Sequence, residues 1–373
     1  MKLLLFFTYN TSLKDWSSSG FLEREAKYYD YLSRKHNIDF TFVTYGDEED
    51  IEIAESRFKF NVIPVYKYKK KMNNKILRFL HSFSIPFFIK KLNLDFDLIK
   101  TNQLNGAWVP IFFRFLVKKP LIVRTGYDIY SFKVKEQDST LKIKFYFYLT
   151  KFSLIFSDVY FSTSLTDINN LKTMFPKYKE KLVLVPNWVE DKKSNTNNSS
   201  KVDSLISVGR LEKQKNFAGL IKSLEKSDFE LNLVGKGSLE KELKNLATRL
   251  NVNVNFIGAI PHGQLIKLLN NINIYISTSS YEGNPKSILE AMNSGCVVIA
   301  NETPNINEII ENNKNGILFN IEKESLNEIL SSLIVDSSKL ENISEAAFIS
   351  VQKKNSLSTV TKKEISEYQK LII

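Results

Sequence analysis

Short runs of β-branched, aromatic and aliphatic residues alternate with helix-length segments along most of the chain. In the first half, the runs that predict strands are residues 3–7, 40–44, 98–100, 121–124, 159–162 and 182–185. The helix-length segments between them include residues 22–35, 75–90 and 141–157. A strand–helix–strand order of this kind favours a parallel sheet with helices on both faces.

A polar stretch at residues 191–203 interrupts this order, and its serine, asparagine and threonine run is typical of a linker. The alternation then resumes, with predicted strands at 205–208, 230–234, 254–257, 274–277 and 297–300. Predicted helices lie between them at 217–226, 239–250, 262–269 and 287–294. The chain of 373 residues suits two domains of roughly 150 residues or more. We therefore predict an α/β protein with two Rossmann-like domains.

The predicted domains are residues 1–190 and 191–373, and the last helix is a candidate to pack back on the first domain. Ligands of such sheets bind at the carboxyl ends of the strands. Two domains joined by a linker are therefore expected to face each other across a ligand-binding cleft.

Composition limits the remaining possibilities. A single cysteine, Cys296, excludes a disulfide framework and favours a reducing compartment such as the cytoplasm. Residues 1–7 are read as a buried strand rather than a signal peptide, and no apolar run approaches the roughly 18 residues of a membrane span. The net charge of +11 favours anionic partners, namely sugar nucleotides, phospholipids or nucleic acid.

The segment SSYEGNPKSILEAM at residues 279–292 follows a predicted strand. We predict Asn284 as the N-cap and Pro285 as the first residue of a helix, whose N–H groups would form an anion site at the strand ends. Glu282 would lie in the loop ahead of this helix and Glu290 inside it. The alternative from pattern alone is that both glutamates are solvated surface charges.

A second cluster is SVGRLEKQKN at residues 207–216. It places a strand, a turn at Gly209, and then Arg210 and Lys215 just ahead of a helix that Asn216 is expected to cap. Lys213, in the same run, is better explained as surface charge.

These two clusters resemble the signature of retaining glycosyltransferases of the GT-B fold, family 4, also called glycosyl transferases group 1. The resemblance covers roughly residues 204–300. It implies transfer of a hexose, with retention, from a nucleotide-diphosphate sugar to a hydroxyl of a glycan or lipid-linked acceptor. It also implies that Arg210 and Lys215 hold the diphosphate, where fixed cations stabilise the charge of the leaving group without a metal. By the same resemblance, Glu290 holds the ribose and Glu282 the hydroxyls of the sugar.

The resemblance further implies a UDP- or GDP-linked donor, and no other cofactor. It assigns donor binding to Gly283, Asn284, Pro285, Lys286, Gly209, Gly235, Gly258 and, in the first domain, Gly20. Gly20 lies in the loop 17–21 between the first predicted strand and helix, where a glycine lets the backbone approach a phosphate. An ordinary turn is the alternative there.

Two features of the first domain limit the mechanism. Many relatives carry a histidine after the strand equivalent to residues 121–124, whereas this chain has RTGYD there, so neither Tyr127 nor Asp128 is assigned a catalytic role. Asp95 and Asp97 imitate the metal-binding Asp-x-Asp of a different glycosyltransferase fold. They lead directly into a predicted strand, so we expect no metal site.

The segment 66–91 interleaves lysines with phenylalanines. Such a pattern suits peripheral contact with an anionic membrane, here at its inner face, and the alternative is a helix packed on its own sheet with lysines outward. Two rival functions remain. A nucleotide-sugar epimerase could use the same scaffold, and a basic nucleic-acid-binding protein could use the charge, but no recognisable nucleic-acid module accompanies it.

Overall fold

The computed structural model describes residues 1–58, 60–194 and 204–372, which form two compact units. The first comprises Met1–Val185 and Thr361–Ile373, and the second comprises Pro186–Val360. The chain thus passes to the second unit at residue 186 and returns to the first at Thr361. Most of the stretch that the sequence marks as a linker lies outside the described residues.

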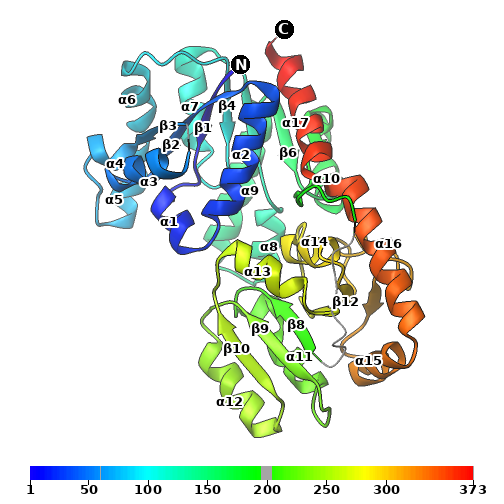
Figure 1. Cartoon of the computed structure of the whole chain (residues 1–373). Coiled ribbons are helices and arrows are strands. Elements are labelled where there is room, and N and C mark those ends of the chain that lie inside the picture. The colour runs from blue at the N-terminus through cyan, green and yellow to red at the C-terminus, as the bar shows by residue number, and fades with distance from the viewer. Residues whose placement is uncertain (59, 195–203, 373) are drawn as a thin grey trace. The chain divides into compact units, whose positions relative to one another are not determined.

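The first unit is built on a parallel sheet with the strand order β3-β2-β1-β4-β5-β6-β7 (Figure 1). Its strands are β1 Lys2–Phe6, β2 Asp39–Thr44, β3 Asn61–Pro64, β4 Leu98–Thr101, β5 Leu121–Arg124, β6 Val159–Ser162 and β7 Leu182–Leu184. The order reverses between β1 and β4, which is the topological switch point of a doubly wound sheet. Leu3, Leu4 and Leu5 of β1 are all buried, as expected for a strand covered on both faces.

The helices of this unit agree with the predicted rhythm, with two corrections. They are α1 Leu13–Ser18, α2 Leu22–His36, α3 Glu49–Arg57, α4 Val65–Tyr68, α5 Lys75–Ser82, α6 Ile85–Lys91, α7 Trp108–Val117, α8 Ile129–Lys135, α9 Thr140–Phe156, α10 Leu165–Met174 and the C-terminal α17 Leu357–Ile372. The single helix predicted over 75–90 is two helices, because Pro86 has no N–H to donate and therefore suits the first turn of α6. Ser17 and Ser18 lie in α1 rather than in a loop, because Ser12 and Asp15 form a capping box that starts a helix.

The second unit has a parallel sheet with the order β10-β9-β8-β11-β12-β13. Its strands are β8 Ser204–Val208, β9 Glu230–Val234, β10 Val254–Gly258, β11 Ile274–Ser277, β12 Val297–Asn301 and β13 Ile317–Phe319. Its helices are α11 Phe217–Ser223, α12 Glu240–Leu250, α13 His262–Leu269, α14 Lys286–Asn293, α15 Leu326–Val335 and α16 Ser337–Asn355. Along β11, Ile274 and Ile276 enter the hydrophobic cluster on one face and Tyr275 the cluster on the other. Helices therefore cover both faces of this sheet.

The last helix carries a buried charge into the first unit. Glu364 of α17 forms an ion pair with Lys100 of β4, and the two side chains are 0% and 1% exposed. The hydroxyls of Tyr28 and Tyr368 also donate to the Glu364 carboxylate. Burial would raise the pKa of Glu364, but the charge of Lys100 and these hydrogen bonds hold it below its usual value. The carboxylate is therefore ionised, and it ties α17 to the sheet.

Candidate functional site

The carboxyl ends of β8, β9, β10 and β11 carry the residues that the sequence analysis singled out in the second unit. Gly209 follows β8, Gly235 follows β9, and Gly258 is the last residue of β10. Glu282 lies in the loop between β11 and α14. Parallel strands end at a common edge of the sheet, which is where ligands of such folds bind.

Backbone contacts between the glycine turns bring this edge together. Gly235 N–H donates to the Gly258 carbonyl at 2.8 Å, and Gly209 N–H donates to the Val234 carbonyl at 2.9 Å. Gly235 has a φ of +142°, and a Cβ there would lie 1.9 Å from the Gly209 oxygen. Only glycine fits this position, because the backbone after β9 runs directly against the backbone after β8.

Lys215 and Glu282 form an ion pair at this edge, with side chains that are 15% and 8% exposed. A Cβ at Gly209 would lie 3.0 Å from Cε of Lys215, so the glycine leaves room for the lysine stem. The hydroxyl of Thr278 donates to the carbonyls of Lys215 and Asn216 at 3.1 and 3.0 Å, which ties the two loops together. The lysine predicted to meet a diphosphate therefore contacts the glutamate predicted to meet the sugar.

Arg210, the other predicted cation, is exposed, and within the described residues it has no carboxylate at ion-pair distance. Its carbonyl accepts from the N–H of Glu212 at 2.8 Å. The Glu212 carboxylate in turn accepts from the N–H and the hydroxyl of Ser238 at 2.9 and 2.7 Å. These bonds, with a smaller effect of Arg210, hold the pKa of Glu212 below its usual value. Arg210 is thus exposed on a loop that the hydrogen bonds between Glu212 and Ser238 hold in place.

The start of α14 differs from the prediction. The helix begins at Lys286, and Pro285 precedes it with extended backbone. Asn284 is not the N-cap, because its side-chain oxygen accepts from the N–H of Asn187 at 2.8 Å, and its carbonyl accepts from the Asn187 amide. Asn284 therefore fixes the loop to the segment after residue 185, and Gly283, which is buried, lies between it and Glu282.

Glu290 is buried within α14 and contacts a histidine that the sequence analysis gave no role. The distance from His262 Nε2 to Glu290 Oε1 is 3.2 Å, and both side chains are 8% exposed. His262 is the first residue of α13, which follows β10 and the Gly258 turn. Its Nδ1 is buried without a hydrogen-bond partner in the described part of the chain. The sequence signal for His262 was its position four residues after Gly258, which the resemblance assigns to donor binding.

Gly20 lies in the first unit, after the end of α1, with a φ of 74°. Its N–H donates to the Ser17 carbonyl at 3.1 Å, which is the geometry of a helix ending in the left-handed region. The positive φ explains why a glycine occupies this position. The approach of its backbone to a phosphate remains a prediction.

Other carboxylates of the first unit have local partners. Asp97 accepts from the N–H of Lys2 at 2.8 Å, and Asp95 forms an ion pair with the Lys2 ammonium at 2.5 Å, at the amino end of the sheet. Asp128 is buried, which raises its pKa, and its carboxylate accepts from the Ser131 hydroxyl. The described residues contain no group of three or more His, Cys, Asp or Glu side chains arranged to hold a metal ion.

Comparisons with known proteins agree on one family. Residues 189–349 match the family model described as glycosyl transferases group 1. The GtfA subunit of the UDP-N-acetylglucosamine–peptide N-acetylglucosaminyltransferase from Streptococcus pneumoniae is 25% identical over 303 residues, which are 78% of this chain and 58% of that protein. The chain thus spans less than two thirds of the length of that relative.

A second relative and a solved structure extend the comparison. The N-acetylgalactosamine-N,N'-diacetylbacillosaminyl-diphospho-undecaprenol 4-alpha-N-acetylgalactosaminyltransferase of Campylobacter jejuni is 23% identical over 75% of this chain and 77% of its own length. The crystal structure of Anabaena HepE in complex with UDP and glucose matches all of both chains with a TM-score of 0.75 at 18% identity. This last likeness shows a shared fold.

Proposed function

We propose that the chain transfers a hexose or hexosamine from a nucleotide-diphosphate sugar to an acceptor hydroxyl, because residues 189–349 match the glycosyl transferases group 1 family and the whole chain has the GT-B fold. The sequence prediction of family 4 membership and of the GT-B fold is confirmed. The nucleotide sugar is assigned to the second unit and the acceptor to the first. The identity of the sugar and of the acceptor belongs to the proposal.

The contact between Lys215 and Glu282 carries this proposal. In sugar transfer the diphosphate gains negative charge as the glycosidic bond breaks, and a fixed ammonium group stabilises that charge most in the transition state. Lys215 is held by Glu282 and by its backbone contacts to Thr278, so little reorganisation is needed when the charge develops. Arg210, which is exposed in the same loop between β8 and α11, is proposed to reach the same diphosphate.

The remaining donor contacts follow from the same edge of the sheet. Glu290 is proposed to bind the ribose hydroxyls, with His262 orienting its carboxylate through the 3.2 Å contact. Glu282 is proposed to accept from hydroxyls of the transferred sugar with the oxygen that Lys215 does not use. The backbone near Gly209, Gly235 and Gly258 is proposed to lie against the nucleotide, together with Gly283, Asn284, Pro285 and Lys286 beside Glu282 and Gly20 from the first unit.

We propose UDP as the nucleotide, and GDP is the alternative. UDP is supported by the HepE crystal structure, which is a complex with UDP and glucose, and by the GtfA relative, whose name specifies UDP-N-acetylglucosamine. The reaction is proposed to retain the anomeric configuration and to need no divalent ion.

A lipid-linked or glycan acceptor is supported by the Campylobacter relative, whose name specifies a diphospho-undecaprenol acceptor. Within the described residues, no helix is long and apolar enough to cross a membrane. We propose that the protein works in the cytoplasm at the inner face of the membrane, where residues 66–91 contact anionic lipid.

Thermal unfolding with a panel of UDP- and GDP-sugars tests the donor assignment. A donor at about a hundred times its dissociation constant should add about 2.7 kcal/mol to the stability of the folded state. Lys215→Gln should lose most of this ligand-induced stabilisation. Lys213→Gln is the matched control, because Lys213 lies two residues away and is exposed.

If no nucleotide sugar stabilises the wild-type protein, the proposed function is wrong. Conversion of the donor sugar to an isomer without any acceptor would instead identify a nucleotide-sugar epimerase.

A further inference from the structure

Three helices of the first unit carry no carboxylate of their own. The helices α5, α7 and α9 have 8, 10 and 17 residues and include no Asp or Glu, although the whole chain has 41. Their basic residues are Lys75, Arg78, Arg114, Lys142, Lys144 and Lys151. Of these helices, only α5 belongs to the segment 66–91 that the sequence analysis identified as basic and aromatic.

An apolar groove lies among these helices. It has a volume of about 600 Å³, and its aromatic walls are Phe79, Phe83, Trp108, Phe112, Phe145 and Phe152. Ring centroids lie 5.1 Å apart for Phe79 and Trp108 and 5.4 Å apart for Phe83 and Phe112, so the walls support one another. The indole N–H of Trp108 donates to the Ser82 hydroxyl at 2.9 Å, and this polar group is therefore already satisfied within the protein. We name this feature the α5–α7–α9 groove.

The helices that provide the groove walls also expose large apolar side chains: Tyr148 lines the groove, and Leu77 and Leu80 lie on α5. Leu77, Leu80 and Tyr148 are 55%, 57% and 62% exposed. Single exposed apolar residues are common on soluble proteins, but several of them on the helices of one apolar groove indicate an interaction site.

The helices of the groove carry cations that are available to a partner: Lys151 lines the groove, Lys75 lies on α5 and Lys144 on α9. Lys75, Lys144 and Lys151 are exposed, and none has a carboxylate at ion-pair distance among the described residues. Lys142 differs, because it forms an ion pair with Asp138 at 2.9 Å. A surface with this charge attracts an anionic partner and repels a second copy of itself, since a symmetric dimer would place the same lysines against each other.

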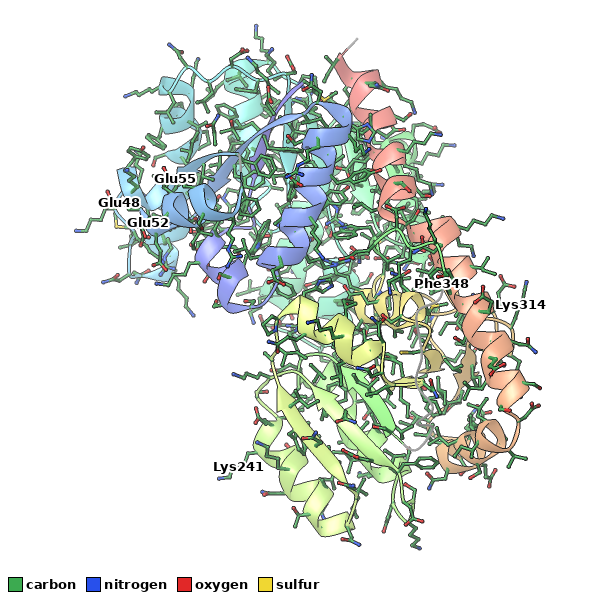
Figure 2. All side chains as sticks on the ribbon, in the orientation of Figure 1. Glu48, Glu52, Glu55, Lys241, Lys314 and Phe348 are labelled. Carbon is green, nitrogen blue, oxygen red and sulfur yellow. The ribbon has the colours of Figure 1, made fainter. Side chains whose placement is uncertain are left out.

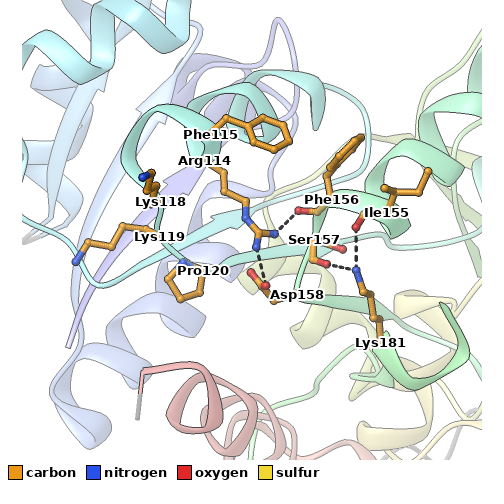
Figure 3. Close-up of a pocket in the computed structure, with 10 residues that line it drawn as sticks. All are labelled: Arg114, Phe115, Lys118, Lys119, Pro120, Ile155, Phe156, Ser157, Asp158 and Lys181. Carbon is orange, nitrogen blue, oxygen red and sulfur yellow. Dashed lines mark hydrogen bonds and ion pairs between the residues drawn. The ribbon is translucent and has the colours of Figure 1, made fainter.

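A neighbouring hollow of about 530 Å³ continues the basic surface, and Ile155 lines both it and the groove (Figure 3). Figure 3 shows that Arg114 and Lys181 bond to the turn between α9 and β6. Lys118 and Lys119 line the same hollow and are exposed. Arg114 and Lys181 thus bond within the protein, whereas the lysines of α5 and α9 named above are exposed to solvent.

We propose that the α5–α7–α9 groove takes an acyl chain of an anionic phospholipid from a bilayer, while Lys75, Lys144 and Lys151 contact the headgroups. Hydrocarbon matches the groove because its walls are mostly phenylalanine rings, and anionic headgroups match helices that carry exposed lysines and no carboxylate. The groove belongs to the first unit and does not involve Lys215, Glu282 or the donor edge. Its failure in the tests below would leave the proposed transferase function unaffected.

Co-sedimentation with vesicles tests the charge complementarity. The protein should pellet with vesicles of phosphatidylcholine mixed with phosphatidylglycerol, pellet little with phosphatidylcholine alone, and dissociate as salt is raised. Each of Lys75→Gln, Lys144→Gln and Lys151→Gln should weaken partitioning by about fivefold. Lys241→Gln is the control, because Lys241 is exposed on α12 of the second unit and extends away from the ribbon in Figure 2.

Fluorescence quenching tests entry of the chain. Phosphatidylglycerol with brominated acyl chains should quench the emission of Trp108, and Trp108→Phe should lose that quenched component while it still sediments with vesicles. Leu80→Asn should weaken both vesicle binding and quenching. Val335→Asn, at a residue 89% exposed in the second unit, should change neither.

Three outcomes would overturn the proposal. The first is no sedimentation of the wild-type protein with phosphatidylglycerol vesicles. The second is sedimentation with the same quenching in the wild type and Trp108→Phe, which would place the rings at the interface without an acyl chain in the groove. The third is a solution dimer that Leu80→Asn dissociates, together with no vesicle binding, which would make the groove an interface between copies. Retained donor-induced stabilisation in Leu80→Asn would show that the donor site is intact throughout.

Discussion

Replacing Lys215 with glutamine should damage stability and activity for different reasons, and a double substitution should separate them. Lys215 and Glu282 form an ion pair whose side chains are 15% and 8% exposed. Removing the ammonium leaves a largely buried carboxylate without its cation, which typically costs about 3 kcal/mol of unfolding free energy. For a domain of the size of the second unit, this corresponds to a decrease in melting temperature of roughly 6–12 °C.

The effect on turnover should be separate and larger than stability alone explains. Loss of one fixed group that stabilises developing charge lowers kcat by about 10²- to 10³-fold. Lys215→Gln should therefore lower kcat by that factor at temperatures where the variant is fully folded. Lys213→Gln should leave both melting temperature and kcat unchanged.

The double variant Lys215→Gln with Glu282→Gln is the decisive measurement. Replacing both partners of a buried ion pair with neutral groups is often close to neutral in stability, so its melting temperature should return most of the way to that of the wild type. Its turnover should stay low, because neither the cation nor the carboxylate is restored. Scanning calorimetry and donor-turnover assays measure both quantities on the wild type, Lys215→Gln, Lys213→Gln and the double variant. Recovery of turnover along with stability would refute the catalytic reasoning and make the pair structural.

The remaining predictions concern the donor edge, the metal and the C-terminal helix. His262→Ala should raise the KM for the donor about tenfold with little change in kcat, because Glu290 loses a charge-assisted contact worth about 1.5 kcal/mol, and steady-state kinetics would show it. Turnover should be unchanged in EDTA, and loss of activity that manganese restores would contradict this. Glu364→Gln should destabilise the first unit by about 3 kcal/mol in urea unfolding, because Lys100 remains buried and unpaired. Since the pKa of Glu364 is lowered in the folded state, the wild-type protein should lose stability as pH falls below 4.5 toward that pKa. The difference between the urea midpoints measured at pH 7 and at pH 4 should therefore be smaller in Glu364→Gln than in the wild type.

The strands of both sheets were largely predictable because strands buried on both faces are nearly continuous apolar runs. The bounds of β5, β6, β9 and β11 agree with the sequence prediction at both ends. Two strands were missed, β3 and β13, which lie at the edges of their sheets. They have only four and three residues, and β3 ends at Pro64, so neither presents a long apolar run.

The groove could not be predicted from the sequence for a related reason. An apolar helix such as α7 has the composition of a core element, and only the tertiary arrangement shows that Phe112 and Phe115 remain 39% and 52% exposed. Residues 66–91 drew attention because lysines and phenylalanines alternate there. The partner helices α7 and α9 come from later parts of the chain.

Contacts between distant residues explain what the sequence did not predict at the candidate site. Asn284 was predicted as an N-cap from its local sequence, but it bonds to Asn187, which lies 97 positions away. Glu290 was identified by its spacing from Glu282, whereas its contact with His262 spans 28 positions and no local pattern encodes it. A propensity or a motif describes neighbours in sequence, and it therefore finds the residue type without finding the partner.

The Lys215 and Glu282 pair shows why this distinction matters for function. The sequence predicted both residues and gave each a separate ligand group, the diphosphate for the lysine and the sugar for the glutamate. In the structure they are one electrostatic unit 67 positions apart in sequence, so changing either residue alters the charge environment of the other. A loss of activity in either single variant would therefore be compatible with a role for only one of them. The roles become separable where the double variant restores stability, because only then does the remaining defect in turnover report on the ligand rather than on an unpaired charge.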